Sequence, residues 1–392
     1  MLVRTGGDSN PRYPCGYNGF RDRRIRPLCH LSAGHFTILM EIEQLPFYAA
    51  FKFMLTLGIE TSCDETSIAV LENESRIIVN LVATQIEAHQ IFGGVVPEIA
   101  SRKHLEMLNP LLETARLDAG LEWRDIDLIA VTAAPGLVGS LLVGVSAAKA
   151  LSFAHRIPCQ PVNHLEGHIA SVFLAQPDLQ FPMLCLVVSG GHSELVLMRG
   201  FNQFERLGRT RDDAIGEAYD KVARALDLPM PGGPNLEKLA AQGDPYGFDF
   251  TVTHLADGFD FSYSGLKTAA SQAKMKQPDK IADIAASFQR AAVSQLRGQV
   301  QKAIEKYKPV TLGLCGGVAA NSAVRHQMET AANEAGISFV VPTRALCTDN
   351  AAMIAAAGYF RFRDLPVEQQ KFDLSVLNFE TKSLLPIGET VS

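Results

Sequence analysis

The sequence predicts an α/β protein with two lobes that flank a cleft. Two segments support this prediction, because each opens with a strand, a turn and a second strand and then alternates helices with strands. The first segment begins at residue 55 and the second at residue 181. Glycine-bearing turns follow strands in both segments, as expected where two lobes close around a ligand. The 392 residues also exceed the roughly 250–300 at which a single core stops growing.

We assign residues 54–175 to the N-terminal lobe. Apolar and β-branched runs between turn residues predict its strands at 55–61, 67–72, 76–84 and 127–136. Pro97 suits the first turn of a helix, whereas Pro110 should break or kink that helix. An alanine-rich helix is expected at 141–155, followed by a short helix that carries two histidines.

We assign residues 176–362 to the C-terminal lobe and residues 363–392 to a C-terminal tail. A strand, a Gly-Gly turn and a second strand occupy 181–200. The other predicted strands are 204–210, 310–317 and 339–343, and the predicted helices are 214–228, 235–243, 281–307, 318–336 and 350–362. The aromatic and irregular segment at about 244–264 is interpreted as an inserted loop.

Residues 1–53 lack this patterning and are interpreted as a disordered leader or an over-extended start, with Met54 opening the folded chain. Their arginine-rich composition leaves a mitochondrial or plastid transit peptide as the alternative. Seven cysteines without a CxxC pair favour a reducing compartment, so the expected location is the cytoplasm. The net charge of −6 argues against a generally basic surface. We find no apolar run of about 18 residues, so no membrane span is expected.

Two histidines, His164 and His168, lie four residues apart in a segment that is predicted to be helical. This spacing places both imidazoles on one helix face, where they can bind one transition metal if a third ligand is supplied. Asp349, at the start of the last predicted helix, could be that ligand or a helix N-cap. The alternative for the histidines is a polar pair on a surface helix. A zinc-protease motif is excluded because Leu165 stands where that motif needs glutamate.

Three glycine-bearing turns follow strands and could hold a phosphate, at 134–140, 189–192 and 316–317. A single turn of this kind is usually only a tight turn, but three together favour an anion of nucleotide size. The GxGxxG and P-loop signatures are absent. Asp64 and Glu65 lie in the first hairpin turn, where an acid can handle a proton or can simply bond its own backbone.

Ten motifs resemble those of the tRNA threonylcarbamoyladenosine transferases, the TsaD family, and occur in the same order from about residue 55 to residue 362. They are ETSCDET, HQIFGGVVPEIASRKH, APGLVGSLLVG, HLEGH, VVSGGHSEL, GEAYDKVA, PGGP, FSYSGLKT, CGGVAAN and CTDNAAM. The resemblance implies a two-lobed fold of the actin, Hsp70 and sugar-kinase type. Each lobe would be RNase H-like, with a nucleotide in the central cleft.

The resemblance also implies a site and a reaction. The metal ligands would be His164, His168 and Asp349, with one Fe²⁺ or Zn²⁺ per chain. The reaction would move a threonylcarbamoyl group from threonylcarbamoyl-AMP to the exocyclic amine of the adenosine 3′ of the anticodon, in tRNAs that read codons beginning with A. Asp64 or Glu65 would assist proton removal. The residues implied in substrate binding are Val187, Val188, Ser189, Gly190, Gly191, Asp220, Gly233 and Asn321. Glu237 is set aside because some members carry aspartate there.

The implied partners are tRNA and either a paralogous subunit with a small ATPase, as in bacterial members, or a second copy of the chain if the protein is organellar. A small-molecule kinase of the same superfamily is the alternative enzyme. Such a kinase would hold Mg²⁺ with oxygen ligands and would not need the histidine pair. An ATP-driven binding protein of the Hsp70 kind would need a separate peptide-binding domain, for which the chain is too short.

Overall fold

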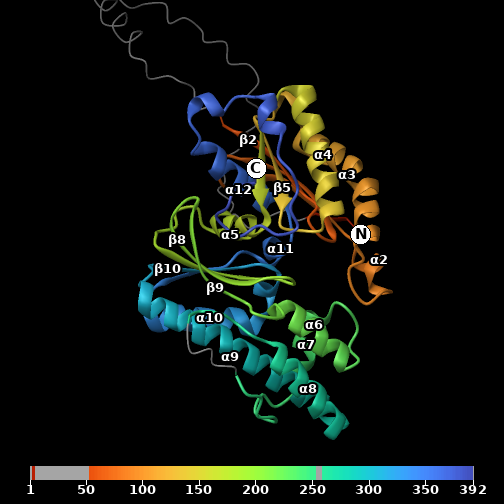
Figure 1. Ribbon diagram of the computed structural model, residues 1–392, viewed down its shortest axis with the longest axis vertical. Helices are drawn as coiled ribbons and strands as arrows, with labels where there is room; N and C mark the ends of the chain where they lie inside the picture. Colours follow the sequence, from red (N-terminus) through yellow and green to blue (C-terminus); the bar gives the residue numbers. More distant parts are fainter. Residues whose placement is uncertain (1, 5–52, 253–257, 392) are drawn as a thin grey trace, which may run out of the picture. The chain divides into compact units, whose positions relative to one another are not determined.

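Two β-sheets form the frame of the computed structural model, which describes residues 2–4, 53–252 and 258–391 (Figure 1). The first sheet has the strand order β1 (Leu2–Arg4), β4 (Arg76–Thr84), β3 (Glu65–Glu72), β2 (Leu55–Glu60), β5 (Leu128–Ala134) and β6 (Cys159–Asn163). The second sheet has the order β11 (Ser338–Val340), β10 (Thr311–Cys315), β7 (Met183–Val188), β8 (Ser193–Gly200) and β9 (Gln203–Arg209).

The two sheets repeat one topology. In the first sheet, β2 pairs antiparallel with β3 and parallel with β5, and in the second sheet β7 pairs antiparallel with β8 and parallel with β10. A third antiparallel strand, β4 or β9, extends each hairpin. Parallel neighbours need long crossover connections, and helices supply them here. The internal repeat predicted from the sequence is therefore confirmed.

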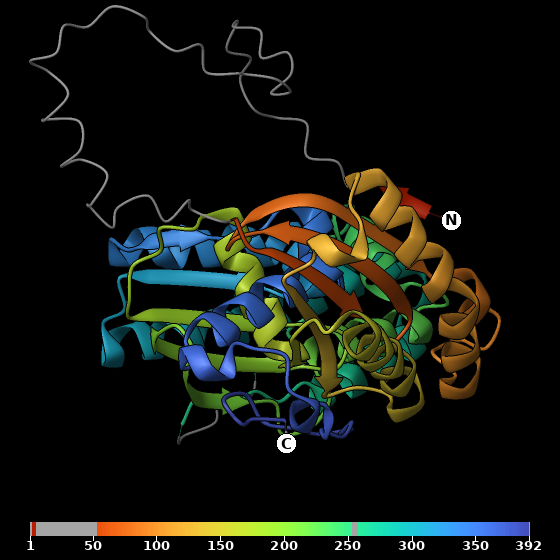
Figure 2. The same cartoon turned by 90° about the horizontal axis from the view of Figure 1, so that it is seen from above.

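Helices cover both faces of the first sheet (Figure 2). Because side chains alternate along a strand, Leu57 and Ile59 of β2 pack with the cluster under α3 (Pro97–Ala119) and α4 (Val138–His155). On the other face, a Cβ at Gly58 would lie 2.1 Å from the carbonyl oxygen of Ala351. Glycine at this position therefore lets α12 (Ala351–Arg363) lie directly on the strand.

Helix α5 (His164–Ala175) is shared by the two sheets. It packs beside α12 and also contacts β7 and β10 of the second sheet. One apolar cluster joins its residues Ile169 and Val172 to Val187 and Val196 of the second sheet and to Ile354 of α12. The junction between the sheets is therefore a packed core, and α5 carries any residue on its buried face into that junction.

Helix α12 follows the second sheet in sequence but packs against β2, β3 and β5 of the first. The C-terminal tail also returns there, since Lys382 N–H donates to the carbonyl of Ala133 (3.0 Å) and Lys149 Nζ to that of Phe379 (2.6 Å). Helix α12 and the tail therefore return to the first sheet after the chain has formed the second sheet. The predicted lobe boundaries at 175 and 362 stay a prediction.

The predicted break at Pro110 is wrong, since α3 continues through it to Ala119. Pro110 and Glu106, the residue whose carbonyl loses its helical partner, are both exposed. Water can therefore satisfy that carbonyl, and Thr114 Oγ1 donates to the carbonyl of Pro110 (2.8 Å). The buried residues of α3, such as Leu108 and Leu111, add packing energy that offsets a proline cost of about 3 kcal/mol.

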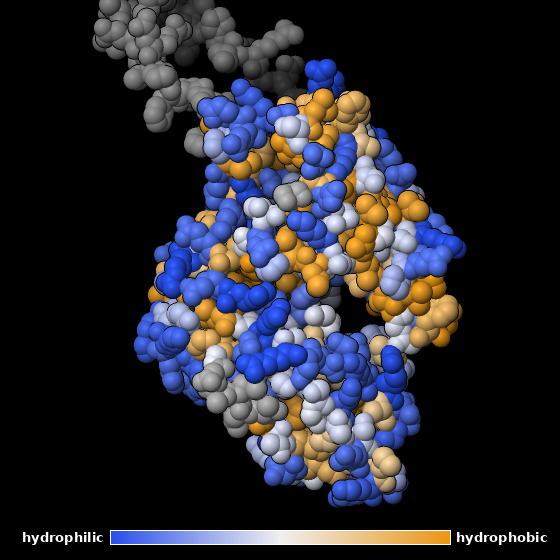
Figure 3. Space-filling model, in the orientation of Figure 1, coloured by the Kyte–Doolittle hydropathy of each residue, from blue (hydrophilic) through white to orange (hydrophobic). Residues whose placement is uncertain are grey.

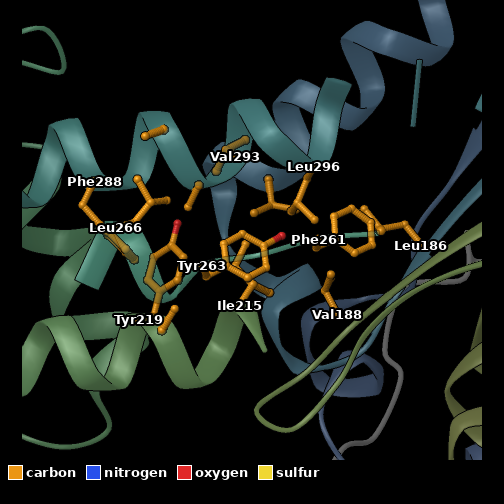
Figure 4. Close-up of a cluster of buried hydrophobic side chains, with 14 of the residues drawn as sticks. Leu186, Val188, Ile215, Tyr219, Phe261, Tyr263, Leu266, Phe288, Val293 and Leu296 are labelled. Atoms are coloured by element: carbon orange, nitrogen blue, oxygen red, sulfur yellow. The ribbon is translucent and has the colours of Figure 1, made fainter. Parts of the chain in front are cut away.

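Five helices enclose the core of the second sheet, namely α6 (Ile215–Ala225), α7 (Gly232–Ala240), α8 (Ser264–Lys276), α9 (Ile281–Tyr307) and α10 (Ser322–Ala335). Figure 4 shows Phe261 and Tyr263 among the side chains of this core, with Tyr263 next to Tyr219 and Phe261 next to Leu186. The predicted inserted loop therefore ends inside the core, and α8, which follows it, was not predicted. Residues 253–257 of that loop lie outside the described residues.

Two expectations about the rest of the chain need correction. Leu2–Arg4 form β1, which pairs with β4, so this short piece of the leader is not disordered. The remainder of the predicted leader, to residue 52, lies outside the described residues. Helix α4, Val138–His155, is long and apolar enough by composition to cross a membrane, contrary to the sequence-based expectation. Its inner side packs on β5 and α3, as a core helix would.

Candidate active site

The two predicted histidines open helix α5. Asn163 caps the helix, because its Oδ1 accepts a hydrogen bond from Leu165 N–H (2.9 Å). His164 and His168 then follow one turn apart on the buried face, with 6% and 0% of their surfaces exposed. Their ring centroids lie 4.7 Å apart. A pair of surface histidines is therefore excluded.

Asp349 brings a carboxylate to this pair from the loop between α11 (Arg344–Cys347) and α12. Its Oδ1 lies 3.5 Å from His164 Nε2 and 3.2 Å from His168 Nε2. The helix N-cap is Asn350, whose side chain accepts from Met353 N–H. Asp349 is therefore free of the capping role that the sequence left open, and the three predicted ligands converge within 4.8 Å of one another.

The donor set fits a transition metal. Within the described residues Nδ1 of buried His168 has no hydrogen-bond partner, and Nε2 faces only the carboxylate of Asp349 at 3.2 Å. A buried polar group without a partner costs about 1–3 kcal/mol, so a metal ion bound by this ring would be favourable. Two ligands about 2.1 Å from an ion at tetrahedral angles lie about 3.4 Å apart, close to the spacings found here. Two imidazoles and one carboxylate suit Fe²⁺ or Zn²⁺, whereas Mg²⁺ prefers oxygen ligands only.

A glutamate that the sequence did not point to, Glu60 at the end of β2, orients the first histidine. Its Oε2 lies 3.1 Å from His164 Nδ1 and accepts from Thr132 Oγ1 (2.5 Å). Its Oε1 accepts from Ser62 N–H (2.5 Å). A carboxylate on the far nitrogen of a ligating histidine fixes the tautomer and makes the near nitrogen a better ligand.

The local charges favour a cation between these ligands. Burial lowers the pKa of His164, but the carboxylates of Asp349 and Glu60 outweigh burial and raise this pKa to about 9. Burial raises the pKa of Asp349, yet His164 and His168 hold it well below its ordinary value. For Glu60, His164 likewise outweighs burial and lowers the pKa. The two carboxylates are thus ionised, and a metal ion can replace the proton that His164 otherwise holds.

The rest of α5 is fixed by neighbours from the end of the chain. Asn163 Nδ2 donates to the carbonyls of Leu385 (3.1 Å) and Pro386 (3.2 Å) in the tail. Arg361 of α12 forms a two-fold ion pair with buried Glu166, with both N–O distances at 2.6 Å. The histidine-bearing helix is therefore held on both sides, by α12 and by the tail.

A cavity of about 600 Å³ lies in the second lobe, a size usual for small-molecule sites. Four of the eight predicted substrate residues line it: Gly190, Asp220, Gly233 and Asn321. The other lining residues are Gly216, Tyr219, Pro234, Glu237, Lys238, Ala241, Gly317, Val318, Ala320, Ser322 and Arg344. Glu237, set aside on sequence grounds, is among them, and its Oε1 accepts from Ser322 N–H (2.8 Å).

The other four predicted substrate residues do not line this cavity. Val187 and Val188 end strand β7 with fully buried side chains. Ser189 and Gly191 belong to the turn between β7 and β8, which is closed by a bond from Ser189 N–H to the carbonyl of His192 (2.9 Å). These four residues position Gly190, the one residue of the turn that reaches the cavity.

Backbone groups and helix ends shape the cavity wall. Asp220 Oδ1 accepts from Gly233 N–H (3.2 Å), and burial raises the pKa of this carboxyl group. The side chain of Asn321 caps α10 and donates to Gln289 Oε1 (3.2 Å). A Cβ at Gly216 would lie 2.5 Å from the carbonyl oxygen of Ser189. Glycine at this position therefore lets α6 approach the 189–192 turn.

Electrostatic interactions link the metal ligands to the cavity. His192, at the end of the turn that supplies Gly190, is half-buried; burial and the charges of His164 and His168 lower its pKa to about 4. The charge of Asp64 acts on Asp220. Burial, Asp64 and Asp349 together raise the pKa of Glu65 well above its usual range. The charge of Asp64 therefore acts on both the predicted acid Glu65 and the cavity, and that of Asp349 acts on Glu65. His192 belongs to the turn at 189–192 that was predicted as a phosphate site, but its place beside the two histidines was not predicted.

Comparison with known structures shows the fold class. Full-length HypF in its phosphate- and nucleotide-bound form gives a TM-score of 0.53 at 13% identity, covering 79% of this chain and 55% of that chain. HypF from T. kodakarensis gives 0.57 at 16% identity, covering 82% and 49%. This chain thus spans about half of each HypF chain, and at such identity the likeness concerns the fold alone. The predicted two-lobed fold of the actin, Hsp70 and sugar-kinase type is confirmed.

Sequence comparison is more specific. A family model described as tRNA N6-adenosine threonylcarbamoyltransferase matches residues 76–356. Relatives of that name from Symbiobacterium thermophilum and Desulfitobacterium hafniense are 51% and 50% identical over 313 and 314 residues. Each match covers 79% of this chain and 92% of the relative. The chain therefore belongs to the family of tRNA N6-adenosine threonylcarbamoyltransferases.

Proposed function

We propose that this protein transfers a threonylcarbamoyl group from threonylcarbamoyl-AMP to the exocyclic amine of the adenosine 3′ of the anticodon, in tRNAs that read codons beginning with A. The observation that carries the proposal is the pairing of a histidine–histidine–aspartate cluster with a cavity of nucleotide size. The family supplies the class of reaction, and the site supplies groups suited to each part of the substrate.

The cavity would hold the adenylate. Asp220 offers a half-buried carboxylate to sugar hydroxyl groups, and Gly190 and Gly233 allow the backbone to come close to the ligand. Gly317, which also lines the cavity, lies at the start of a short 3₁₀ segment after β10. The free N–H groups in such a turn suit a phosphate. The acyl end would then point out of the cavity along the turn that ends in His192.

The metal ligands would lie at the acyl-phosphate end of the substrate. We expect His164, His168 and Asp349 to hold one Fe²⁺ or Zn²⁺ per chain. When bound, such an ion acts as a Lewis acid on the carbonyl and neutralises the leaving phosphate. Glu60 would keep His164 in the tautomer that leaves Nε2 free to bind.

In the proposed step the adenine amine attacks the carbamoyl carbon. A new C–N bond forms, the bond from that carbon to the phosphate oxygen breaks, and AMP leaves with the electron pair. The amine proton must pass to a base, for which Glu65 is the better of the two predicted acids. Burial and the charge of Asp64 raise the pKa of Glu65, which makes its ionised carboxylate a stronger base. Asp64 would then act on Glu65 through its charge.

The test is direct. Purified protein is supplied with threonylcarbamoyl-AMP and an anticodon stem-loop RNA, with and without a paralogous subunit and a small ATPase, and the digested nucleosides are examined by mass spectrometry. We expect threonylcarbamoyladenosine from RNA that has adenosine at the target position and none from RNA that has guanosine there. If no threonylcarbamoyladenosine forms either with or without the partner proteins, the proposal is refuted. Phosphorylation of a small molecule would favour the kinase alternative.

The location of the protein is part of the same proposal. We propose a cytoplasmic enzyme, with a mitochondrion or plastid as the alternative if residues 1–53 are a transit peptide. Cell fractionation combined with a mass measurement of the N-terminus separates the two. We expect a cytoplasmic chain that begins at Met1 or Met54, and a chain cleaved at another residue and found in an organelle fraction would contradict that location.

A further inference from the structure

We propose that Arg206 and Arg209 of strand β9 form a binding surface for the RNA backbone beside the active site. This inference rests on the proposed function, because it takes the acceptor to be an RNA. Strand β9 is the edge of the second sheet, and both arginines are exposed. We call these two residues the arginine row.

A β-bulge places both guanidinium groups on one face of the sheet. Arg206 pairs with Val196 and Arg209 with Glu194, and the register shifts between these pairs because Leu207 is an extra residue. In a regular strand, residues three positions apart point to opposite faces. The extra residue of the bulge shifts the alternation by one, so that Arg206 and Arg209 point to the same face. Val196 belongs to the cluster shared with α5 and α12. The arginine row therefore emerges on the sheet face that is turned towards the histidine-bearing helix.

The opposite face keeps the bulge in place. Leu207 packs against the core of the second sheet. A Cβ at Gly208 would lie 2.2 Å from the carbonyl oxygen of Phe259. The backbone of the 244–264 segment therefore contacts strand β9 directly at Gly208. A slip of the register would turn Leu207 out of that core and bring a larger residue against Phe259. The arrangement of the arginine row is thus determined by packing on the far side.

The arginine row leads towards the active site. Glu194, the partner of Arg209, comes two residues after His192, which ends the turn that supplies Gly190 to the cavity. At about 3.4 Å per residue, Arg209 lies roughly 7 Å along the sheet from His192, and Arg206 lies about 7 Å further away. This spacing between side chains on one face resembles the spacing of neighbouring phosphates along a single strand of RNA.

The arginine row keeps its positive charge at the surface. Over the described parts of the chain neither guanidinium has an ion pair, whereas nearby Arg199 and Arg211 are paired with Glu205 and Asp260. The charge of Glu194 acts on both arginines of the row and that of Asp260 acts on Arg209. The side chain of Glu194 is only 7% exposed, and Asp260 already forms an ion pair with Arg211. The space-filling view shows a strongly hydrophilic strip over β9 (Figure 3). Within this hydrophilic strip, Arg206 and Arg209 supply positive charge on a chain with a net charge of −6.

These features suit RNA phosphates. Arginine forms two parallel hydrogen bonds with a phosphate, and contacts of this kind position a nucleic acid without reading its sequence. A loop held along the row would lie with one end at the turn beside His192, where a single base can extend into the site. An acidic protein surface is the competing partner, but it would have no need of a row directed at the active site.

The test compares the wild-type protein with the Arg206→Ala/Arg209→Ala variant, using the full chain and a fluorescent anticodon stem-loop RNA at several salt concentrations. We expect RNA affinity at low salt to fall on the order of tenfold. We also expect the slope of log affinity against log salt to lose about 0.7 for each arginine. The KM for RNA should rise, while the KM for threonylcarbamoyl-AMP, the metal content and the unfolding temperature stay unchanged.

Two control variants make the test specific. Lys302→Ala/Lys306→Ala removes the same charge from an exposed face of α9 and should leave RNA binding unchanged. Arg206→Lys/Arg209→Lys keeps the charge and should retain most of the affinity. Suppose that the wild type modifies RNA and that the alanine variant binds RNA with the same affinity and salt slope as the wild type. This result would overturn the inference and leave the proposed function standing. An alanine variant that binds RNA normally but no longer binds a partner protein would lead to the same conclusion. A wild type that binds but never modifies RNA would overturn both.

Discussion

The candidate metal site and the cavity are built in different ways. At the candidate metal site, side-chain interactions fix the ligands. Glu60 contacts His164, and helix α5 is bound through Arg361 of α12 and through the tail carbonyl that accepts from Asn163. The cavity wall is made mainly of backbone, glycines and helix ends, as at Gly216 and Asn321. The difference shows that an ion needs ligand atoms at fixed points, whereas a nucleotide needs close approach to the main chain.

This comparison predicts two separable kinds of damage. Loss of one side chain at the metal centre should lower metal binding and leave the adenylate site intact. An added methyl group at the cavity should lower adenylate binding and leave the metal in place. The following predictions run from the largest expected effect to the smallest.

The largest effect is expected from His168→Ala. Removal of one of three ligands should reduce the metal content from about one ion per chain to less than about a tenth, and should reduce transfer by at least about 100-fold. Metal analysis by mass spectrometry and a nucleoside assay check these values. His155→Ala, on an exposed part of α4, is the matched control. A variant that keeps its full metal content would refute the ligand assignment.

Glu60→Gln should have the next largest effect. The amide cannot supply the negative charge that acts on His164, so metal affinity should weaken by about 10–100-fold, measured by competition with a chelator. Glu72→Gln, which removes a surface partner of Arg76, should leave the affinity unchanged. Equal metal affinity in wild type and Glu60→Gln would mean that Glu60 serves only the packing of β2.

Gly216→Ala tests the cavity. The new Cβ would lie 2.5 Å from the carbonyl oxygen of Ser189, and overpacking of this kind costs about 1–3 kcal/mol. The 189–192 turn must move to make room for this Cβ, so adenylate affinity, measured by calorimetry, should fall on the order of tenfold while the metal content stays the same. Gly298→Ala is the control, because nothing lies within 4 Å of a Cβ there. Loss of metal from Gly216→Ala would contradict the separation of the two sites.

Asn163→Ala should have the smallest effect. It removes the cap of α5 and both bonds to the tail, so unfolding free energy should fall by about 1 kcal/mol and metal affinity should fall slightly. Chemical denaturation measures the first quantity. Asp373→Ala, which removes the cap of a short 3₁₀ segment in the tail, is the control and should leave metal affinity unchanged. Wild-type stability in Asn163→Ala would contradict the role of this residue in holding α5.

The sequence predicted the parts of the molecule that have a local signal. The helix at 281–307 was expected with the bounds that α9 shows, because its apolar period is long and unbroken. The histidine pair was predicted because its spacing has a direct chemical meaning. Glu60 carries no such signal, since 104 positions separate it from His164. Only the pairing of β2 with β5, and of β5 with β6, brings the two ends together.

The other differences also come from tertiary contacts. A proline inside a helix usually breaks it, yet α3 continues through Pro110. The exposed position of Pro110 and the packing of other α3 residues allow this. Phe261 and Tyr263 lie in a segment without period, and their burial depends on α6 and α9. Only four of the eight predicted substrate residues line the cavity, for the same reason. Other lining residues, such as Ser322 and Arg344, come from separate elements that only the tertiary fold brings together.

The central claim is that the metal at His164, His168 and Asp349 serves the transfer reaction. The most direct measurement is product formation by chelator-treated protein before and after the return of one equivalent of Fe²⁺ or Zn²⁺, with adenylate binding followed in parallel. We predict that treated protein still binds adenylate, forms less than about 1% of the wild-type product, and recovers when metal returns. Full product formation by metal-free protein would contradict the account.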